Sequence, residues 1–193
     1  MVHATSACDR SLGKEIVPKA ASRAHHRGSG GRSLGVVDLL APDDPWASYA
    51  RTVVVIVRPD ASNLVVEAAP PGRTGAWTWA TEDAVHILTA WDPGDARPAD
   101  AENRANQSAL EAELRASSSG PALDELWDAV GVDPVSGHRE EGVAVRGLTL
   151  DTVRHLGARY GQDAVFEWTP QSWAVVACDG DRRSDFGWVV TPG

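Results

Sequence analysis

The chain has 193 residues, of which 42% are hydrophobic, and a formal net charge of −9 at pH 7, a composition typical of a globular protein. It contains no apolar run of about 20 residues, the length that crosses a membrane as a helix, so we expect a soluble protein with no membrane partner. Residues 1–36 hold six basic and two acidic side chains. The remaining acidic body therefore disfavours nucleic acid as a partner.

Residues 1–33 are rich in Ser, Ala, Gly, Arg and His and have few apolar side chains, which predicts a disordered basic leader. This leader lacks the apolar central segment of a secretory signal. The two cysteines, Cys8 and Cys178, do not suggest a disulfide framework, so we expect a cytoplasmic protein. We expect residues 34–193 to form a single domain.

Hydrophobic periodicity and turn residues predict the elements of this domain. A short helical or irregular lead-in over residues 34–49 precedes a β-hairpin of strands 52–57 and 64–68. The later elements are, in chain order, a strand at 85–91, a helix at 101–116, strands at 126–132 and 141–146, a helix at 150–160, and strands at 164–168 and 173–178. Most of the eight tryptophans are expected to pack in the core or across strands, with Trp91 as the exception and with Trp77 and Trp79 alternating as in a strand.

The order β-α-β-β-α-β over residues 85–168 is that of the split βαβ arrangement. We therefore predict an α+β fold with a ferredoxin-like core, a mostly antiparallel sheet and both helices on one face. The N-terminal hairpin and the C-terminal strand are expected to extend this sheet.

The clearest candidate site is the run Thr89–Gly94, where an apolar strand ends beside the start of a helix. Trp91 could stack on a planar ligand, and Asp92 could face a ligand or could instead be a turn carboxylate before Pro93. In the following helix, helical spacing backward from Leu110 and Leu114 gives Gln107 and Asn103. Buried amides need partners, so the spacing leaves two alternatives open, a bound ligand or the protein's own backbone.

Glu140 and Glu141 open the strand predicted at 141–146. Alternation puts Glu141 on the face of Val143 and Val145, where burial would raise its pKa and suit it to general acid catalysis. The alternative is that both glutamates are solvated, and the adjacent His138 is expected on the surface. Gln162 is expected in a structural network at the sheet end opposite Trp91.

We predict a ligand-binding set and two catalytic candidates, Asp92 and Glu141, and leave open whether the protein is an enzyme. The predicted ligand-binding residues are Trp91, Asp92, Asn103, Gln107, Glu140 and Glu141. An oxygen cluster of Asp92, Glu102, Glu140 and Glu141 would suit a hard cation, but no spaced pair of histidines supports a metal site. We therefore expect neither a metal nor a cofactor.

The sequence also lacks the Gly-x-Ser-x-Gly, Gly-x-Gly-x-x-Gly and Walker-type patterns, which argues against α/β-hydrolase and common nucleotide-binding sites. Several short motifs stand out along the chain, namely Thr89–Pro93, Glu102-Asn103, Gly131–Pro134, Arg139–Glu141 and Gly161–Phe166. Together they resemble a bacterial domain-of-unknown-function family, number 3293, over roughly residues 45–178. The family pattern has Asn at the place of Asp92 and Ser at that of Gly142, and the resemblance implies no particular activity.

The leading functional hypothesis is therefore a small polar metabolite as ligand, bound between Trp91 and Asn103. One alternative is a protein-interaction or assembly module, such as a homodimer, that uses an exposed sheet face. Another is a regulator whose basic leader contacts nucleic acid.

Overall fold

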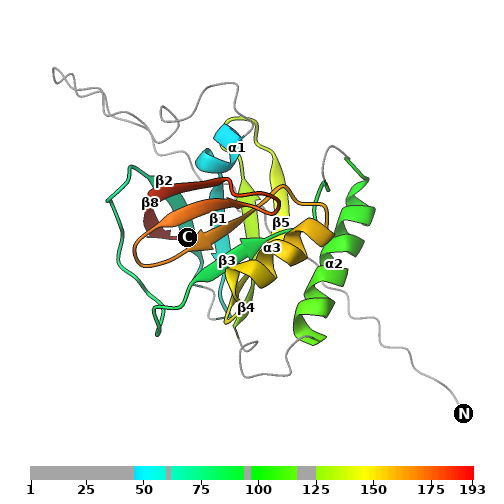
Figure 1. The fold of residues 1–193 in the computed structure, drawn as a ribbon, viewed down its shortest axis with the longest axis horizontal. Coiled ribbons are helices and arrows are strands. Elements are labelled where there is room, and N and C mark those ends of the chain that lie inside the picture. Colours follow the sequence, from blue (N-terminus) through cyan, green and yellow to red (C-terminus); the bar gives the residue numbers. More distant parts are fainter. Residues whose placement is uncertain (1–45, 60–61, 94–96, 117–124) are drawn as a thin grey trace, which may run out of the picture. The chain divides into compact units, whose positions relative to one another are not determined.

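The computed structural model describes residues 46–59, 62–93, 97–116 and 125–193 (Figure 1). The predicted leader lies outside these residues. The elements are α1 (Trp46–Arg51), β1 (Val53–Val57), β2 (Leu64–Ala69), β3 (Val85–Leu88), α2 (Asp100–Ala116), β4 (Leu126–Val132), β5 (Arg139–Arg146), α3 (Leu150–Arg159), β6 (Ala164–Trp168), β7 (Trp173–Ala177) and β8 (Arg183–Pro192).

The eight strands form a closed barrel in the order β1-β2-β8-β7-β6-β3-β5-β4, and β4 returns to pair with β1. Every neighbouring pair is antiparallel. The prediction of a ferredoxin-like α+β fold with an open, extended sheet is therefore wrong.

Two pairings close the sheet, and neither could be read from local sequence. The N-terminal hairpin joins β4 through β1, with Val55 opposite Val130. The strand β8, which the sequence analysis missed, bridges β7 and β2, with Ala69 opposite Gly187. Both edges of the predicted four-stranded core are consequently paired. This core, β6-β3-β5-β4, forms half of the barrel wall.

Large aromatic side chains fill much of the barrel interior. Trp168, Trp173 and Trp188 are fully buried, and the rings of Trp168 and Trp188 meet edge to face at 5.2 Å. Trp77 approaches Trp168 at 5.1 Å. Trp77 and Trp79 lie in a loop, so the predicted strand pair there is wrong, but both pack against the core. Such edge-to-face contacts add to the stabilisation that burial provides.

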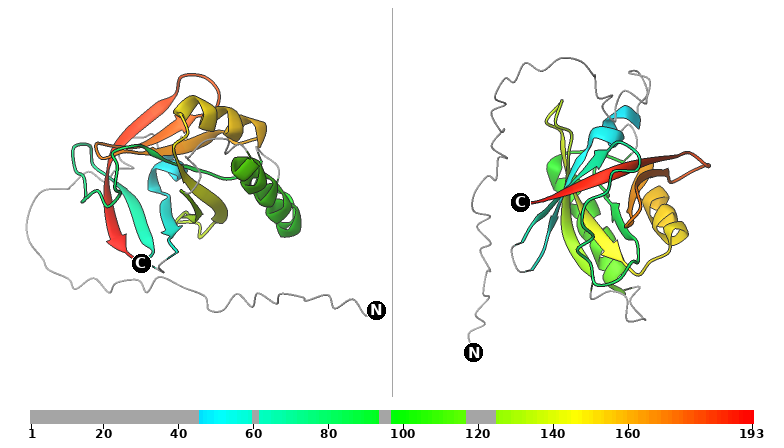
Figure 2. Two further views of the ribbon diagram at one scale, coloured as in Figure 1. Left: turned by 90° about the horizontal axis from the view of Figure 1, so that it is seen from below. Right: turned by 90° about the vertical axis from the view of Figure 1, so that its left-hand side faces the viewer.

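A second core lies outside the barrel, where α2 and α3 cover one side of the wall (Figure 2). Leu110 and Leu114 of α2 belong to the same cluster as Val143 and Val145 of β5. The inward residues of β5 alternate with these, so both faces of this strand are covered.

The outward valines of β1 are not covered in the same way. Val53 and Val55 are half-buried, and Val57 is 40% exposed. The alternative of an interaction module, including a homodimer, stays a prediction. Among the described residues, no helix combines the length and the apolar character needed to cross a membrane.

A glycine in β8 tests the barrel closure. A Cβ atom at Gly187 would overlap the backbone carbonyl oxygens of Pro70 and Arg73, whereas a Cβ at Gly131 would meet only the Cγ2 of Thr52, at 3.4 Å. We expect Gly187→Ala to lower the free energy of unfolding by about 1–3 kcal/mol, the usual cost of overpacking. Gly131→Ala, the control, should change it by less than about 1 kcal/mol. Urea denaturation measures both, and an unchanged Gly187→Ala variant would contradict the closure.

Candidate functional site

Side-chain amides hold the backbone that leaves β3. The Ala90 N–H donates to Gln107 Oε1 (3.0 Å), and the Asp92 N–H donates to Asn103 Oδ1 (3.0 Å). Asn103 Nδ2 donates in turn to Asp92 Oδ1 (2.7 Å). Asn103 and Gln107 are buried on the same stripe of α2 as Leu110 and Leu114, which is the stripe that helical spacing predicts. The sequence left two alternatives for the partners of these amides, a bound ligand or the protein's own backbone. The geometry matches the second, because protein groups form hydrogen bonds with both amides.

Gln162 completes this network. Its Nε2 donates to the Trp91 carbonyl oxygen (2.9 Å), so the prediction that Gln162 lies at the opposite sheet end is wrong. The reason is that β3 and β6 are antiparallel, which places the start of β6 beside the end of β3. Together the amides hold Asp92 at φ 43°, a left-handed conformation that is rare outside glycine.

The two adjacent glutamates have opposite environments. Glu141 shares a face with Val143, as alternation requires, but its side chain is exposed at the strand start. Glu140 points into the mouth of the barrel, and burial raises its pKa above the usual value. Periodicity could not distinguish them, because the second face of a barrel strand is also an interior face.

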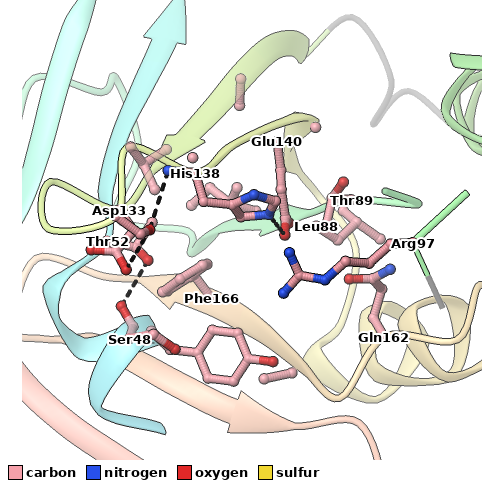
Figure 3. Close-up of a pocket in the computed structure, with 18 residues that line it drawn as sticks. Ser48, Thr52, Leu88, Thr89, Arg97, Asp133, His138, Glu140, Gln162 and Phe166 are labelled. Atoms are coloured by element: carbon pink, nitrogen blue, oxygen red, sulfur yellow. Dashed lines mark hydrogen bonds and ion pairs between the residues drawn. The ribbon is translucent and has the colours of Figure 1, made fainter. Parts of the chain in front are cut away.

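A cavity of about 310 Å³ opens at this mouth of the barrel. Apolar side chains from four strands contribute to its wall, namely Val54, Ile87, Ala129 and Phe166. Polar side chains complete it, and they include Tyr49, Arg97, His138, Glu140 and Gln162. Figure 3 shows the Arg97 guanidinium reaching into the cavity near Glu140, with Gln162 beside it.

A second pocket, of about 410 Å³, adjoins the first and shares Arg97 and His138 with it. Of the predicted ligand-binding residues, four line it: Trp91, Asp92, Asn103 and Glu141. Glu140 lines the first cavity instead, and Gln107 lines neither.

His138 connects the two pockets. Its Nε2 lies 2.9 Å from Glu140 Oε1 and 3.6 Å from Asp92 Oδ2. The sequence analysis expected His138 on the surface, and its side chain is 42% exposed, but it did not consider His138, Arg97 or Tyr49 as site residues. The spacing of His138 and Glu140, two residues apart at the start of a strand, is the one signal that could have paired them on one face. Glu102 and Glu141 of the predicted oxygen cluster are not part of this group, whereas the ligating atoms of Asp92, His138 and Glu140 lie within 4.8 Å of one another.

An ion pair fixes the turn that carries His138. Arg51 donates from Nε to Asp133 Oδ1 and from Nη2 to Oδ2, both at 3.0 Å. Asp133 also accepts from the Val135 N–H and from the Ser136 hydroxyl. The Arg51 guanidinium consequently holds the pKa of Asp133 well below its usual range. The Asp133 N–H donates to the His138 carbonyl oxygen (2.9 Å), which closes the turn.

Burial also affects Tyr49, which comes from α1. Desolvation and the nearby Asp163 and Glu140 carboxylates raise its pKa to about 12. The phenol therefore remains protonated at neutral pH and offers a hydrogen-bond donor to the cavity.

These features define a closed, eight-stranded antiparallel barrel with a polar site at one mouth and two helices on its outer wall. Residues 88–165 match the family described as "Protein of unknown function (DUF3293)", so the family resemblance predicted from the sequence is confirmed for this segment. The matched residues include Asp92, Arg97, Asn103, His138 and Glu140. Neither the comparison with curated proteins nor that with solved structures yields a match.

The contribution of the hydrogen bonds between Asn103 and Asp92 to stability can be measured. Asn103→Ala removes the partners of the Asp92 N–H and of Asp92 Oδ1. We expect a loss of about 1–3 kcal/mol in the free energy of unfolding, the cost of leaving partly buried polar groups unpaired. Ser108→Ala, at an exposed position of the same helix, is the control and should be nearly neutral. Equal stabilities of the two variants in urea denaturation would refute this role.

The Asp133 ion pair predicts a pH dependence. The pKa of Asp133 is lower in the folded than in the unfolded state. Its contribution to the free energy of unfolding is therefore complete above the pKa of the unfolded state, about 3.9. The contribution is lost as the pH falls below that value toward the folded pKa. We expect Asp133→Asn to be less stable than the wild type at pH 7 and the difference to shrink below about pH 4. Denaturation at a series of pH values measures this, and a difference that grows on acidification would contradict it.

Proposed function

We propose that this protein binds a small polar metabolite that carries an anionic group and an apolar part, in the cavity at the mouth of the barrel. The observation that carries the proposal is the cavity itself, with an apolar wall from the strands and a guanidinium at its polar side. Its volume of about 310 Å³ is at the lower end of the range for small-molecule sites.

Arg97 supports the anionic group in this proposal. Within the part of the chain that the structure describes, no carboxylate forms an ion pair with Arg97, although Asp92 and Glu140 lie nearby. A guanidinium presents paired N–H donors that match a carboxylate or a phosphate. A ligand carboxylate in the cavity would therefore find both charge and geometry at Arg97.

The remaining walls support a ligand of mixed character. Phe166 and Ile87 offer apolar contact, whereas the Tyr49 phenol, protonated at neutral pH, can donate a hydrogen bond. The amides that the sequence suggested as ligand contacts, Asn103 and Gln107, are already bonded to the backbone and to Asp92 or Glu111. The proposal therefore moves the ligand from the Trp91–Asn103 run to the adjoining cavity and gives those amides a positioning role.

Matched pairs of probes test the proposal. Thermal unfolding is measured with benzoate against benzamide and with hexanoate against hexanamide, which differ chiefly in charge. We expect only the anions to stabilise the protein, by about 2.7 kcal/mol at 100 times the dissociation constant. Arg97→Gln should abolish the effect. Arg58→Gln removes an equal charge from a residue that packs on Trp79 and lines neither pocket, so it should leave the effect intact.

A second variant tests the location. Ala129→Leu adds bulk at the cavity wall and should abolish binding without removing a charge. Equal stabilisation by the amides, or anion binding that persists in both Arg97→Gln and Ala129→Leu, would overturn the proposal.

A further inference from the structure

We infer that Asp92, His138 and Glu140 form a binding site for a divalent transition-metal ion where the two pockets meet. This inference is independent of the organic ligand proposed above. It contradicts the sequence-based expectation of no metal, which rested on the lack of a spaced histidine pair. Here a single histidine combines with two carboxylates from separate segments.

The distances fit ligation. Zinc binds imidazole nitrogen and carboxylate oxygen at about 2.0–2.2 Å, so neighbouring ligand atoms lie roughly 3–3.5 Å apart. His138 Nε2 is 2.9 Å from Glu140 Oε1 and 3.6 Å from Asp92 Oδ2. All three ligating atoms lie within 4.8 Å of one another.

Groups that are not ligands hold each of the three residues in place. Asn103 donates to Asp92 Oδ1 and leaves Oδ2 directed toward His138. The turn before β5 is closed by the bond from the Asp133 N–H to the His138 carbonyl oxygen, and Arg51 anchors Asp133. Glu140 belongs to β5, where it lies opposite Gly131 of β4. Outer hydrogen bonds of this kind orient the ligands of natural metal sites.

The charges of the three side chains also favour a divalent cation. Two carboxylates face one imidazole at the partly buried mouth of the barrel. With a neutral imidazole the group carries two negative charges, which a divalent cation would balance. The Arg97 guanidinium reaches toward Glu140 and adds one positive charge beside this group.

The donor set defines the class of ion. One imidazole nitrogen and two carboxylate oxygens suit Zn²⁺, Mn²⁺, Fe²⁺, Co²⁺ or Ni²⁺ better than Mg²⁺ or Ca²⁺, which prefer oxygen alone. Three protein ligands leave a position open for water or another molecule, as in catalytic zinc sites. His138 and Glu140 line the cavity, and Asp92 and His138 line the second pocket, so the site borders both.

Metal titration of the full chain tests the inference. His25 and His26 could also bind a cation, so the background is the double variant His25→Ala, His26→Ala. After treatment with EDTA and dialysis, the protein is titrated with Zn²⁺ by calorimetry and with Co²⁺ by visible absorption. We expect one equivalent to bind in this background.

Variants assign the site. His138→Gln, Asp92→Asn and Glu140→Gln should each weaken binding at least about tenfold, the smallest loss usual even for an outer partner. His155→Ala, on the exposed face of α3, is the matched control and should bind as the background does. Circular dichroism confirms that each variant is folded, and three separate substitutions guard against the failure of one to fold. No bound equivalent in the background, or undiminished binding in His138→Gln and Glu140→Gln, would show that these residues form only a structural ion network and would overturn the inference.

Discussion

Three side-chain amides hold the chain where it leaves β3, and the geometry of the site depends on them. Gln107, Asn103 and Gln162 bond successive backbone groups from Ala90 to Asp92. The same contacts keep Asp92 in a left-handed conformation with one carboxylate oxygen directed at His138. A helix outside the barrel and a turn before β6 thereby position a carboxylate at the barrel mouth.

The size of the inward side chains decides where the barrel is hollow. At the cavity end the strands contribute small residues, among them Ala129, Gly131 and Gly142. A Cβ at Gly142 would come within 2.8 Å of the Leu88 carbonyl oxygen, so a side chain there would push β5 away from the end of β3. Away from the cavity, tryptophans such as Trp168 and Trp188 fill the interior. Large side chains pack closely and leave no space where they meet. The space for a ligand therefore lies at the end of the barrel where small side chains line the strands.

Much of the candidate site could be located from sequence, but less of its chemistry. The Thr89–Gly94 run predicted a site where a strand ends beside a helix start, which is a local pattern, and Trp91 and Asp92 of this run line the second pocket. The buried stripe with Asn103 and Gln107 followed from helical spacing. His138 and Tyr49 were missed because the first is on a turn and the second on a short helix distant in sequence. No local sequence pattern predicts that these elements lie next to each other.

The sequence by itself determined most of the strands and helices, though not β8, since each depends on side-chain periodicity and on turn residues within a few positions. Strands β4 and β6 begin and end at the residues that those patterns predict. The buried face of α2 is also the one that helical spacing predicts. Only the tertiary structure decided that the sheet closes, because the pairings of β1 with β4 and of β8 with β2 join segments far apart in the chain. Closure made the second face of β5 an interior face, and it thereby directed Glu140, rather than Glu141, into the cavity.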